Sequence, residues 1–366
     1  MIVLWIFLGA LLLLLLQHVL YFKFWNRKLR MSLRFDQPSV TAGETVSVTE
    51  LVSNRKLLPL PLFRYRYGLC RNFDQLFGPD GKQIYVSYKL ALPAQRSVRN
   101  KTILKDLKRG IYTIADSSLE AQDLFYWGHF SEPFVSRARL IVYPKKISAE
   151  KLHLPYRQLL GAVLTRRYAQ EDPFEIRNIR PYEPFDSMRD INWKASAKTG
   201  ELKVNQHDYT TDEALLLILD AEHGTEEQRE TVISLASSLA ALFLHRGISV
   251  SVCANSRGCV SGGMALVPSG AGISHLRTID EALSQIKLGA SAPMSFSAFL
   301  SQLSLQGALR SCCTVISAGG SPEVSAAFDR LCGSEHGYYI QVGTDAFVPQ
   351  GSQFTILPYS EREVII

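Results

Sequence analysis

The sequence lacks the short motifs that mark the common nucleotide-, zinc- and ester-handling enzymes. Its 366 residues contain no GxxxxGK[ST] phosphate loop, no HExxH pair and no GxSxG nucleophile turn. The glycine-rich stretch from Pro268 to Leu276 has no lysine, so a turn leading into a helix explains it better than a phosphate site. Internal repeats and low-complexity tracts are also missing. We therefore nominate no catalytic residue from motifs.

Cysteine and histidine are scarce and scattered. The chain has 6 Cys and 8 His, no two cysteines have CxxC spacing, and His207, His223 and His275 lack the spacing of metal ligands. The cysteines lie mostly in apolar stretches, which favours reduced, packed thiols over a disulfide framework. This pattern is typical of an intracellular protein.

One long apolar run stands at the start of the chain. Residues 1–22 contain no Asp, Glu, Lys or Arg, and about 20 residues of helix measure roughly 30 Å, enough to cross the hydrocarbon core of a bilayer. No basic residue precedes the run and no small-x-small site follows it, which favours a transmembrane helix over a cleaved signal peptide. Lys23, Arg27, Lys28 and Arg30 follow directly. The positive-inside rule therefore predicts a single-pass protein of the plasma (inner) membrane with cytoplasmic soluble domains.

Charge is divided unevenly along the chain. Residues 204–366 carry 8 Lys and Arg against 16 Asp and Glu, a balance of −8, and the other residues carry 32 against 18, a balance of +14. The basic part is attached to the apolar run, and attraction to anionic lipid explains it. Nucleic-acid binding would require a recognisable module, and because none is found we expect no nucleic-acid partner.

Residues 31–145 predict a β-sandwich-like domain. Short alternating runs such as TVSVTELV, FRYRYGL and QIYVSYKLAL are separated by clusters of Pro, Gly, Asn and Asp, without long helical periodicity. The spacing of the turn signals predicts about seven or eight antiparallel strands packed as two sheets. Domains of this kind usually act as spacers or interaction surfaces.

Residues 205–366 follow a different pattern, which predicts an α/β domain. The run from Ala214 to Ala221 is a continuous apolar strand of the type that is buried on both faces, and a helix with an apolar stripe is expected from Glu226 to Arg246. Strand and helix signals then alternate through ISVSVCAN, CCTVISAG and GYYIQVG, with helices near residues 275–286 and 323–331. A mainly parallel sheet covered by helices on both faces is expected, and residues 146–204 form the linker or junction between the two domains.

The junction contains RPYEPFDSMRDINWKASAK, the most recognisable run of the chain. It resembles the bacterial family called domain of unknown function 58 (DUF58), in which the run reads Arg-x-Tyr-x-x-Gly-Asp-x-x-Arg-x-Ile-x-Trp-x-x-Ser-Ala-Arg. Phe185 stands where the family has its glycine and Lys198 where it has the last arginine. The upstream stretches RGIYTIADSSLEAQDLFYW and VYPK extend the likeness. The matching residues of the run are Arg180, Tyr182, Asp186, Arg189, Ile191, Trp193, Ser196 and Ala197.

The resemblance implies a fold and a partner. Members of the family carry N-terminal membrane spans, a β-sandwich-like region and a von Willebrand factor A-like domain, and they resemble partners of AAA+ ATPases of the MoxR type. We therefore expect a membrane-anchored, non-catalytic scaffold for protein interactions. On this hypothesis it works with a MoxR-type ATPase in the assembly or maturation of envelope-associated complexes.

The residue types of the motif suit a semi-buried junction. There a guanidinium and a carboxylate pair through two hydrogen bonds, and rings such as Trp193 seal the pair from water. A partner-binding surface and an anion site are the alternatives. The anion site underlies a competing hypothesis, a hydrolase or anion-binding enzyme at Arg180, Asp186, Arg189 and Asp220, which requires those four side chains to converge on one pocket.

Asp220 follows the first strand of the α/β domain, where many von Willebrand factor A-like domains hold Mg²⁺ with an Asp-x-Ser-x-Ser loop. Both serine positions are changed here, so the site is degenerate at Asp220, Glu222 and Gly224. Mg²⁺ requires oxygen ligands in near-octahedral arrangement, and we therefore expect neither a metal nor another cofactor. Asp220 is expected to cap the following helix or to accept hydrogen bonds at the edge of the sheet.

The acidic residues of this loop are candidates for binding the protein partner. Ligands of open α/β sheets bind beyond the carboxyl ends of the strands, and negative charge there steers a basic partner toward the site. The candidate partner-binding residues are Asp220, Glu222, Glu226 and Glu227.

Overall fold

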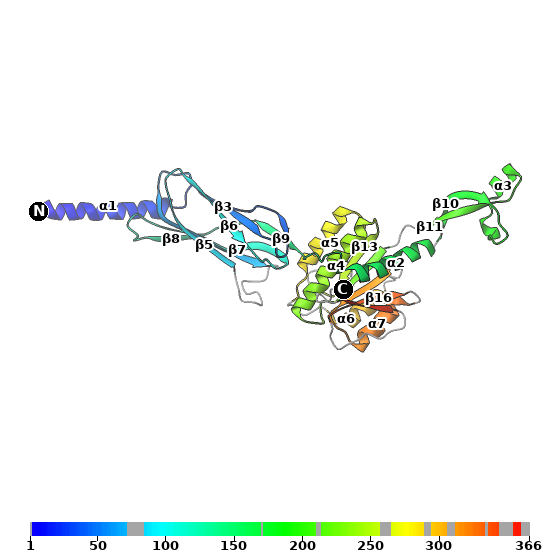
Figure 1. The fold of residues 1–366 in the computed structure, drawn as a ribbon. Helices are drawn as coiled ribbons and strands as arrows, with labels where there is room; N and C mark the ends of the chain where they lie inside the picture. Colours follow the sequence, from blue (N-terminus) through cyan, green and yellow to red (C-terminus); the bar gives the residue numbers. More distant parts are fainter. Residues whose placement is uncertain are drawn as a thin grey trace. The chain divides into compact units, whose positions relative to one another are not determined.

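The computed structural model describes residues 2–71, 84–169, 171–209, 214–256, 265–288, 294–305, 312–333, 336–343 and 354–359. The chain divides into two compact units (Figure 1), a first unit of Met1–Lys145 with Leu283–Gly289 and a second unit of Lys146–Ala282 with Ala290–Ile366. An N-terminal apolar helix is followed by a body rich in strands.

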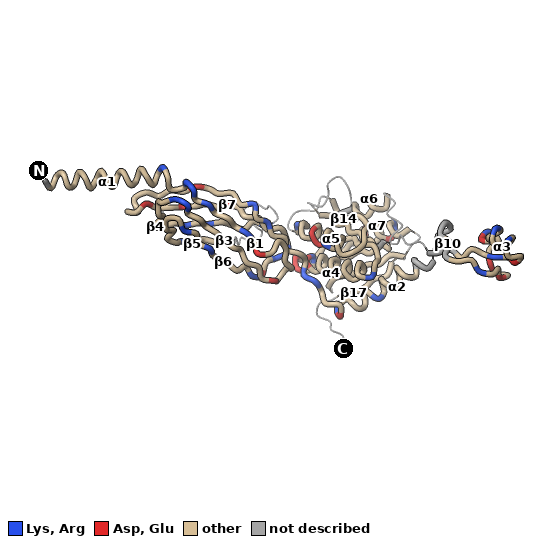
Figure 2. The backbone as a smooth tube through the Cα atoms, turned by 90° about the horizontal axis from the view of Figure 1, so that it is seen from above, with Lys and Arg blue, Asp and Glu red and all other residues tan. Residues whose placement is uncertain are grey.

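The first unit begins with the apolar helix α1 (Ile2–Phe24). It is long and apolar enough to cross a membrane, and Figure 2 shows no charged residue along it before Lys23 near its carboxyl end. The helix continues two residues beyond the predicted span of 1–22. Tyr21 and Trp25 are buried in the first unit, so the last turns of α1 belong to a protein core as well as to the apolar helix.

Two sheets complete the first unit. The smaller has the order β1 (Leu29–Phe35), β3 (Val46–Asn54) and β6 (Ser97–Leu104). The larger has the order β2 (Ser39–Thr41), β9 (Arg139–Tyr143), β7 (Gly110–Gln122), β4 (Leu60–Arg71) and β5 (Ile84–Leu92), with β8 (His129–Pro133) paired to β7. Neighbours are antiparallel except β2 and β9, which are parallel. The described strands exceed the predicted number, and β2, with 3 residues, is too short to show alternation.

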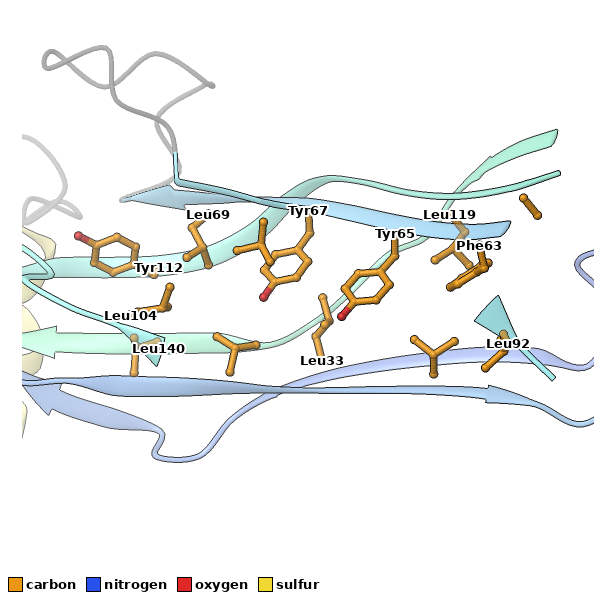
Figure 3. Packing of buried hydrophobic residues seen from close by; sticks show 14 of the residues in the cluster. Leu33, Phe63, Tyr65, Tyr67, Leu69, Leu92, Leu104, Tyr112, Leu119 and Leu140 are labelled. Carbon is orange, nitrogen blue, oxygen red and sulfur yellow. The ribbon is translucent and has the colours of Figure 1, made fainter. Parts of the chain in front are cut away.

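Side chains from both sheets form one hydrophobic cluster. In Figure 3, Tyr65 and Tyr67 of β4 point from the larger sheet toward the smaller one, from which Leu33 of β1 points back. Alternate residues of β3 are buried, as expected for a strand with one face on a core. The alternation read from the sequence therefore corresponds to the buried faces of these strands.

This cluster encloses one carboxylate. Glu50 is fully buried and accepts hydrogen bonds from the hydroxyl groups of Tyr65, of Tyr67 at 2.6 Å and of Thr102 at 2.7 Å. Burial, and then the contact with Glu50, raises the pKa of both tyrosines. Because buried polar groups are costly unless they are hydrogen-bonded, this group of four residues fixes how β4 of the larger sheet packs against β3 and β6 of the smaller one.

The second unit is built on a six-stranded sheet. Its order is β14 (Ala265–Gly270), β13 (Ser249–Ala254), β12 (Ala214–Leu219), β15 (Cys312–Ser317), β16 (Gly337–Val342) and β17 (Phe354–Tyr359). All neighbours are parallel except β13 and β14. The first strand in the chain, β12, is central, so the sheet is wound in both directions from it.

Four helices lie between the strands of the six-stranded sheet in the described part of the chain. They are α4 (Glu226–His245), α5 (Ile273–Gln285), α6 (Phe296–Leu305) and α7 (Pro322–Cys332). α4 begins with a capping box of Thr225 and Gln228 and is followed by Gly247 at φ 75°, which confirms the predicted stop. The stretch Pro268–Gly270 was predicted as a turn into a helix but belongs to β14, and the helix begins only at Ile273.

The predicted junction is folded rather than an irregular linker. It contains α2 (His153–Ala169), β10 (Glu171–Pro181), the 3-10 helix η1 (Met188–Asp190) and α3 (Trp193–Thr199), and β10 pairs antiparallel with β11 (Lys203–Tyr209). The β10–β11 register shifts between Asp172 and Asn178. These irregularities break the alternation of side chains, which explains why β10 is not evident in the sequence.

Candidate functional site

The DUF58-like motif folds around an ion pair. Arg180, near the end of β10, donates to both carboxylate oxygens of Asp186, with nitrogen–oxygen distances of 2.7 and 2.5 Å. The backbone N–H of Glu183 donates to Asp186 Oδ2 at 2.8 Å. The hydrogen bonds from Arg180 hold the pKa of Asp186 below its usual value. The two-bond pairing expected from the sequence is present, and it closes the turn after β10.

The rest of the motif segment is held by caps and a small buried contact. Asn192 caps α3 by accepting from Ala195 N at 2.9 Å, and Ser196 Oγ donates to Asn192 O at 2.8 Å while accepting from Lys203 N at 2.8 Å. Ile191 is buried and forms a β-bridge with Val204 of β11. Ile191 and Ser196 therefore anchor the segment.

Large apolar side chains of the same segment face solvent. Phe185 is 82% exposed, Met188 76% and Trp193 68%. The expectation that Trp193 is buried and seals the ion pair is wrong. Its helix α3 has only 7 residues, of which Ser196 alone is buried, so the segment has too little core to cover an indole ring. We call Phe185, Met188 and Trp193 the motif apolar set.

A second arrangement lies at the carboxyl ends of two adjacent parallel strands, β12 and β15. Asp220, directly after β12, is 1% exposed. Its Oδ1 accepts from the backbone N–H groups of Glu222 at 2.8 Å and His223 at 3.3 Å. Its Oδ2 accepts from Ser317 Oγ at 2.6 Å and lies 2.8 Å from His223 Nδ1. Of the two roles predicted for Asp220, hydrogen bonding at the sheet edge is the one observed.

His223 places a titratable ring beside this carboxylate. The hydrogen bond with Asp220 raises the pKa of His223 above its usual value, although partial burial opposes the rise. An opposite charge within hydrogen-bonding distance favours the protonated ring. The pair of Asp220 and His223 thus forms a buried carboxylate with a titratable counter-charge.

Contacts from three elements fix the loop after β12. Asn255, which follows β13, accepts from Ala221 N at 2.8 Å, and Glu222 Oε2 accepts from Phe296 N of α6 at 2.6 Å. Gly224 has φ 86°, and a Cβ there would lie 2.5 Å from Ala318 Cβ. Position 224 therefore excludes any side chain.

The residues of this loop do not fit a Mg²⁺ site. Both oxygens of Asp220 and one of Glu222 already accept hydrogen bonds, and position 224 has no room for a ligand. Within the described ranges, no group of three or more His, Cys, Asp or Glu side chains could hold a metal ion.

The four residues of the competing enzyme hypothesis form two separate sets. Arg180 and Asp186 pair beside the two-stranded sheet, Arg189 is exposed on η1, and Asp220 is buried after β12 of the six-stranded sheet. Ser317 donates to Asp220 and not to a histidine, whereas a nucleophilic serine must give its proton to a general base. The described residues around Asp220 therefore do not form an acyl-transfer triad.

The predicted partner-binding residues differ in their exposure to solvent. Glu222, Glu226 and Glu227 are exposed, but Asp220 is buried and its oxygens are engaged, so it does not face a partner. Sequence reasoning missed Ser317 and the role of His223, since Ser317 lies 97 residues from Asp220 in the chain. His207 and Cys259 fall outside the residues whose side chains are described.

Comparison with known proteins identifies one family. A family described as a protein of unknown function, DUF58, matches residues 178–317. This match supports the DUF58 family. The DUF58 match begins just before Arg180 and ends at Ser317, so it includes both the motif segment and the Asp220 loop. No curated protein matches the chain.

Solved structures are similar to part of the chain at low identity. A CARDB domain from Pyrococcus furiosus, in complex with di-metal ions, is 9% identical with a TM-score of 0.19, covering 31% of this chain and 94% of that one. The alkylpurine DNA glycosylase AlkC of Pseudomonas fluorescens, bound to DNA with an abasic site analog, is 11% identical with a TM-score of 0.19, covering 31% and 30%. A Listeria innocua β-glucosidase is 11% identical with a TM-score of 0.18, covering 30% and 16%.

Proposed function

We propose that this protein is a membrane-anchored, non-catalytic scaffold that holds a protein partner at the cytoplasmic face of the plasma (inner) membrane. In this proposal α1 is a single-pass transmembrane helix. Its length and apolar surface support that role, and the basic residues that follow it support the orientation.

The architecture proposed for the two soluble parts follows the family resemblance. The first unit is a β-sandwich-like domain, which the shared hydrophobic cluster of its two sheets supports. The second unit contains a von Willebrand factor A-like domain. Its central first strand and its single antiparallel edge strand, β14, support this assignment.

The proposed partner is an AAA+ ATPase of the MoxR type, which the resemblance to DUF58 proteins suggests. The main support for a binding role is the exposure of the motif apolar set. These side chains lie on a segment held by the Arg180–Asp186 pair and capped helices. Exposed large apolar side chains often mark interaction sites, and tryptophan is enriched among residues that dominate binding energy. A rigid support lowers the entropy lost on binding.

The alternative, a hydrolase or anion-binding enzyme at Arg180, Asp186, Arg189 and Asp220, has less support. Arg180 already donates to both oxygens of Asp186, and four donors surround Asp220, so neither carboxylate is poised to act as a base.

The test of partner binding is affinity purification of the full chain from native membranes. A MoxR-type ATPase should co-purify with the wild-type protein and be lost from the Trp193→Ala variant. Val135→Ala is the control, because Val135 is 92% exposed but lies in the first unit. Retention of the ATPase by Trp193→Ala, or recovery of no such ATPase, would contradict the proposal.

The orientation has its own test. A reporter fused after Ile366 should behave as cytoplasmic, because Lys23, Arg27, Lys28 and Arg30 follow the apolar helix. A periplasmic reporter signal would reverse the orientation and remove the cytoplasmic ATPase as a partner.

A further inference from the structure

The turn between β7 and β8 exposes four consecutive large apolar side chains. Leu124 is 48% exposed, Phe125 56%, Tyr126 60% and Trp127 65%. We call Asp123–Gly128 the aromatic turn. Runs of this kind are unfavourable on a soluble surface unless they serve a function, so the aromatic turn requires an explanation that the proposed scaffold role does not supply.

The aromatic turn is held in one conformation by a buried carboxylate. The Asp123 side chain is fully buried, and it accepts hydrogen bonds from Trp127 N at 2.9 Å and Gly128 N at 3.0 Å. Tyr126 N donates to the Asp123 carbonyl at 3.2 Å. These bonds fix the ends of the turn, and the four apolar side chains between them project to solvent.

The same carboxylate joins the turn to α1. His18 Nδ1 lies 3.1 Å from Asp123 Oδ2, and the His18 ring lies 6.1 Å from the Trp127 ring, centroid to centroid. A Cβ at Gly128 would come within 2.8 Å of the His18 ring, so only glycine allows this approach. Trp25 stacks on Phe130 of β8 at 6.1 Å and closes the contact from the end of the helix.

The contact lies inside the apolar span rather than beyond its end. Six residues separate His18 from Phe24, the last residue of α1, which is about 9 Å of helix. The apolar span from Val3 to Phe24 has 22 residues, or about 33 Å of helix, close to the thickness of a bilayer core. A bilayer that surrounds α1 therefore reaches the level of the aromatic turn.

The loop between β3 and β4 also meets α1 and the residues that follow it. Tyr21 Oη donates to Pro59 O at 2.7 Å, and Arg55 N donates to Lys28 O at 3.1 Å. Between these contacts Leu57 is 78% exposed. This end of the unit therefore combines exposed apolar side chains with basic residues. Aromatic rings at the interface and basic side chains next to it are typical of membrane-facing surfaces.

We propose that the aromatic turn is a second membrane-binding element, which inserts Leu124, Phe125 and Trp127 into the interface of the leaflet beside α1. The ligand is a bilayer containing anionic phospholipid. The inference rests on the proposed membrane-spanning role of α1. If the aromatic turn binds the bilayer, the first unit is attached to the membrane at two points, α1 and the turn, which restricts its rotation about the helix.

The test uses tryptophan fluorescence of the full chain in vesicles of phosphatidylcholine and phosphatidylglycerol, with and without bromine on the acyl chains. The chain has 4 Trp, and single replacements by Phe give the contribution of Trp5, Trp127 and Trp193 by difference. Trp5 reports on α1. Trp193, 68% exposed in the second unit, is matched in exposure to Trp127.

We expect brominated lipid to quench the Trp5 and Trp127 contributions and to leave that of Trp193. Replacing Leu124 and Phe125 together with Ser should lower the quenching of Trp127 without changing that of Trp5. Quenching of Trp5 without Trp127 would overturn the inference and leave the membrane span intact. If neither is quenched, the membrane-spanning role of α1 and membrane binding by the aromatic turn are both contradicted. Equal quenching of Trp127 and Trp193 would indicate unspecific contact and also overturn it.

Discussion

Trp127 and Trp193 are almost equally exposed, at 65% and 68%, yet their surroundings differ. Trp127 lies in a turn that contacts an apolar helix, whereas Trp193 begins a short helix beside the Arg180–Asp186 ion pair. Exposure alone therefore does not define the partner of an aromatic side chain. Because of these different neighbouring groups, we propose lipid as the partner of Trp127 and protein as the partner of Trp193.

The two tryptophans share one structural device. In each segment a carboxylate accepts at least one hydrogen bond from the backbone and so fixes a turn. Asp123 binds Trp127 N and Gly128 N, and Asp186 binds Glu183 N. The difference lies in burial, because the Asp123 side chain is fully buried, whereas that of Asp186 is 9% exposed and its partner Arg180 is 35% exposed.

The largest expected effect is that of replacing Asp123, the more buried of these two carboxylates. Asp123→Ala should lower the free energy of unfolding of the first unit by about 3 kcal/mol, because two backbone N–H groups lose their acceptor and at least that of Gly128 is buried. Chemical unfolding of the full chain in detergent micelles measures the change. Asp186→Ala should cause a smaller change, and a larger one would break the comparison.

Charge reversal in the second unit should have the next largest effect. Replacing Glu222, Glu226 and Glu227 with Lys should slow association with the ATPase and reverse its salt dependence, since exposed acidic residues act mainly on association rate. A variant with only Glu226 and Glu227 replaced is the control, because Glu222 also accepts a hydrogen bond from Phe296 N. Stopped-flow binding at two salt concentrations measures the effect. An unchanged rate would contradict a docking role for these acidic residues and leave the motif apolar set as the proposed docking surface.

The titratable pair of the second unit gives a smaller effect with a defined sign. Because the folded-state pKa of His223 is raised, the contact with Asp220 stabilises the fold fully below the unfolded pKa of about 6.5 and loses this effect as pH rises through the raised value. His223→Gln should remove that part of the pH dependence. The Arg180–Asp186 pair behaves oppositely, since the pKa of Asp186 is lowered and the pair weakens only as acid protonates it. Unfolding curves between pH 5 and 8 measure the effect of His223, and curves that extend below about pH 4 are needed for that of Asp186. Equal slopes for wild type and His223→Gln between pH 5 and 8 would contradict the assignment.

The tryptophans themselves should contribute least to stability. Trp127→Ala and Trp193→Ala should each lower the free energy of unfolding by less than about 1 kcal/mol, as expected for exposed side chains. Thermal unfolding of the full chain in micelles measures this. A loss typical of a buried aromatic residue, roughly 3 kcal/mol or more, would show that the ring packs against protein after all.

The sequence predicted elements whose signal is local. α1 follows from one apolar run, and α4 follows from its apolar stripe, Thr225 cap and Gly247 stop. β12 follows from a strand buried on both faces. In each case neighbouring residues carry the whole pattern, so no knowledge of the rest of the fold is needed.

Features that depend on distant residues were not predictable in the same way. Ser317 meets Asp220 only because β12 and β15 are adjacent in the sheet, and the shifts in register hide the alternation of β10. Burial of Trp193 was wrongly expected because residue types do not show how much core surrounds a ring. The Arg180–Asp186 pair was predictable, since its partners are six residues apart.

The close approach at Gly128 has an evolutionary consequence. A Cβ there would lie 2.6 Å from the Phe130 ring and 2.8 Å from the His18 ring, so the turn tolerates a larger residue only if both rings shift or are replaced. We expect related sequences to keep glycine at this position wherever a ring stands at position 18, and to change both together. The apolar helix and the strands that contact it would then evolve together. Exchanging the helix for that of an unrelated membrane protein would therefore destabilise the first unit.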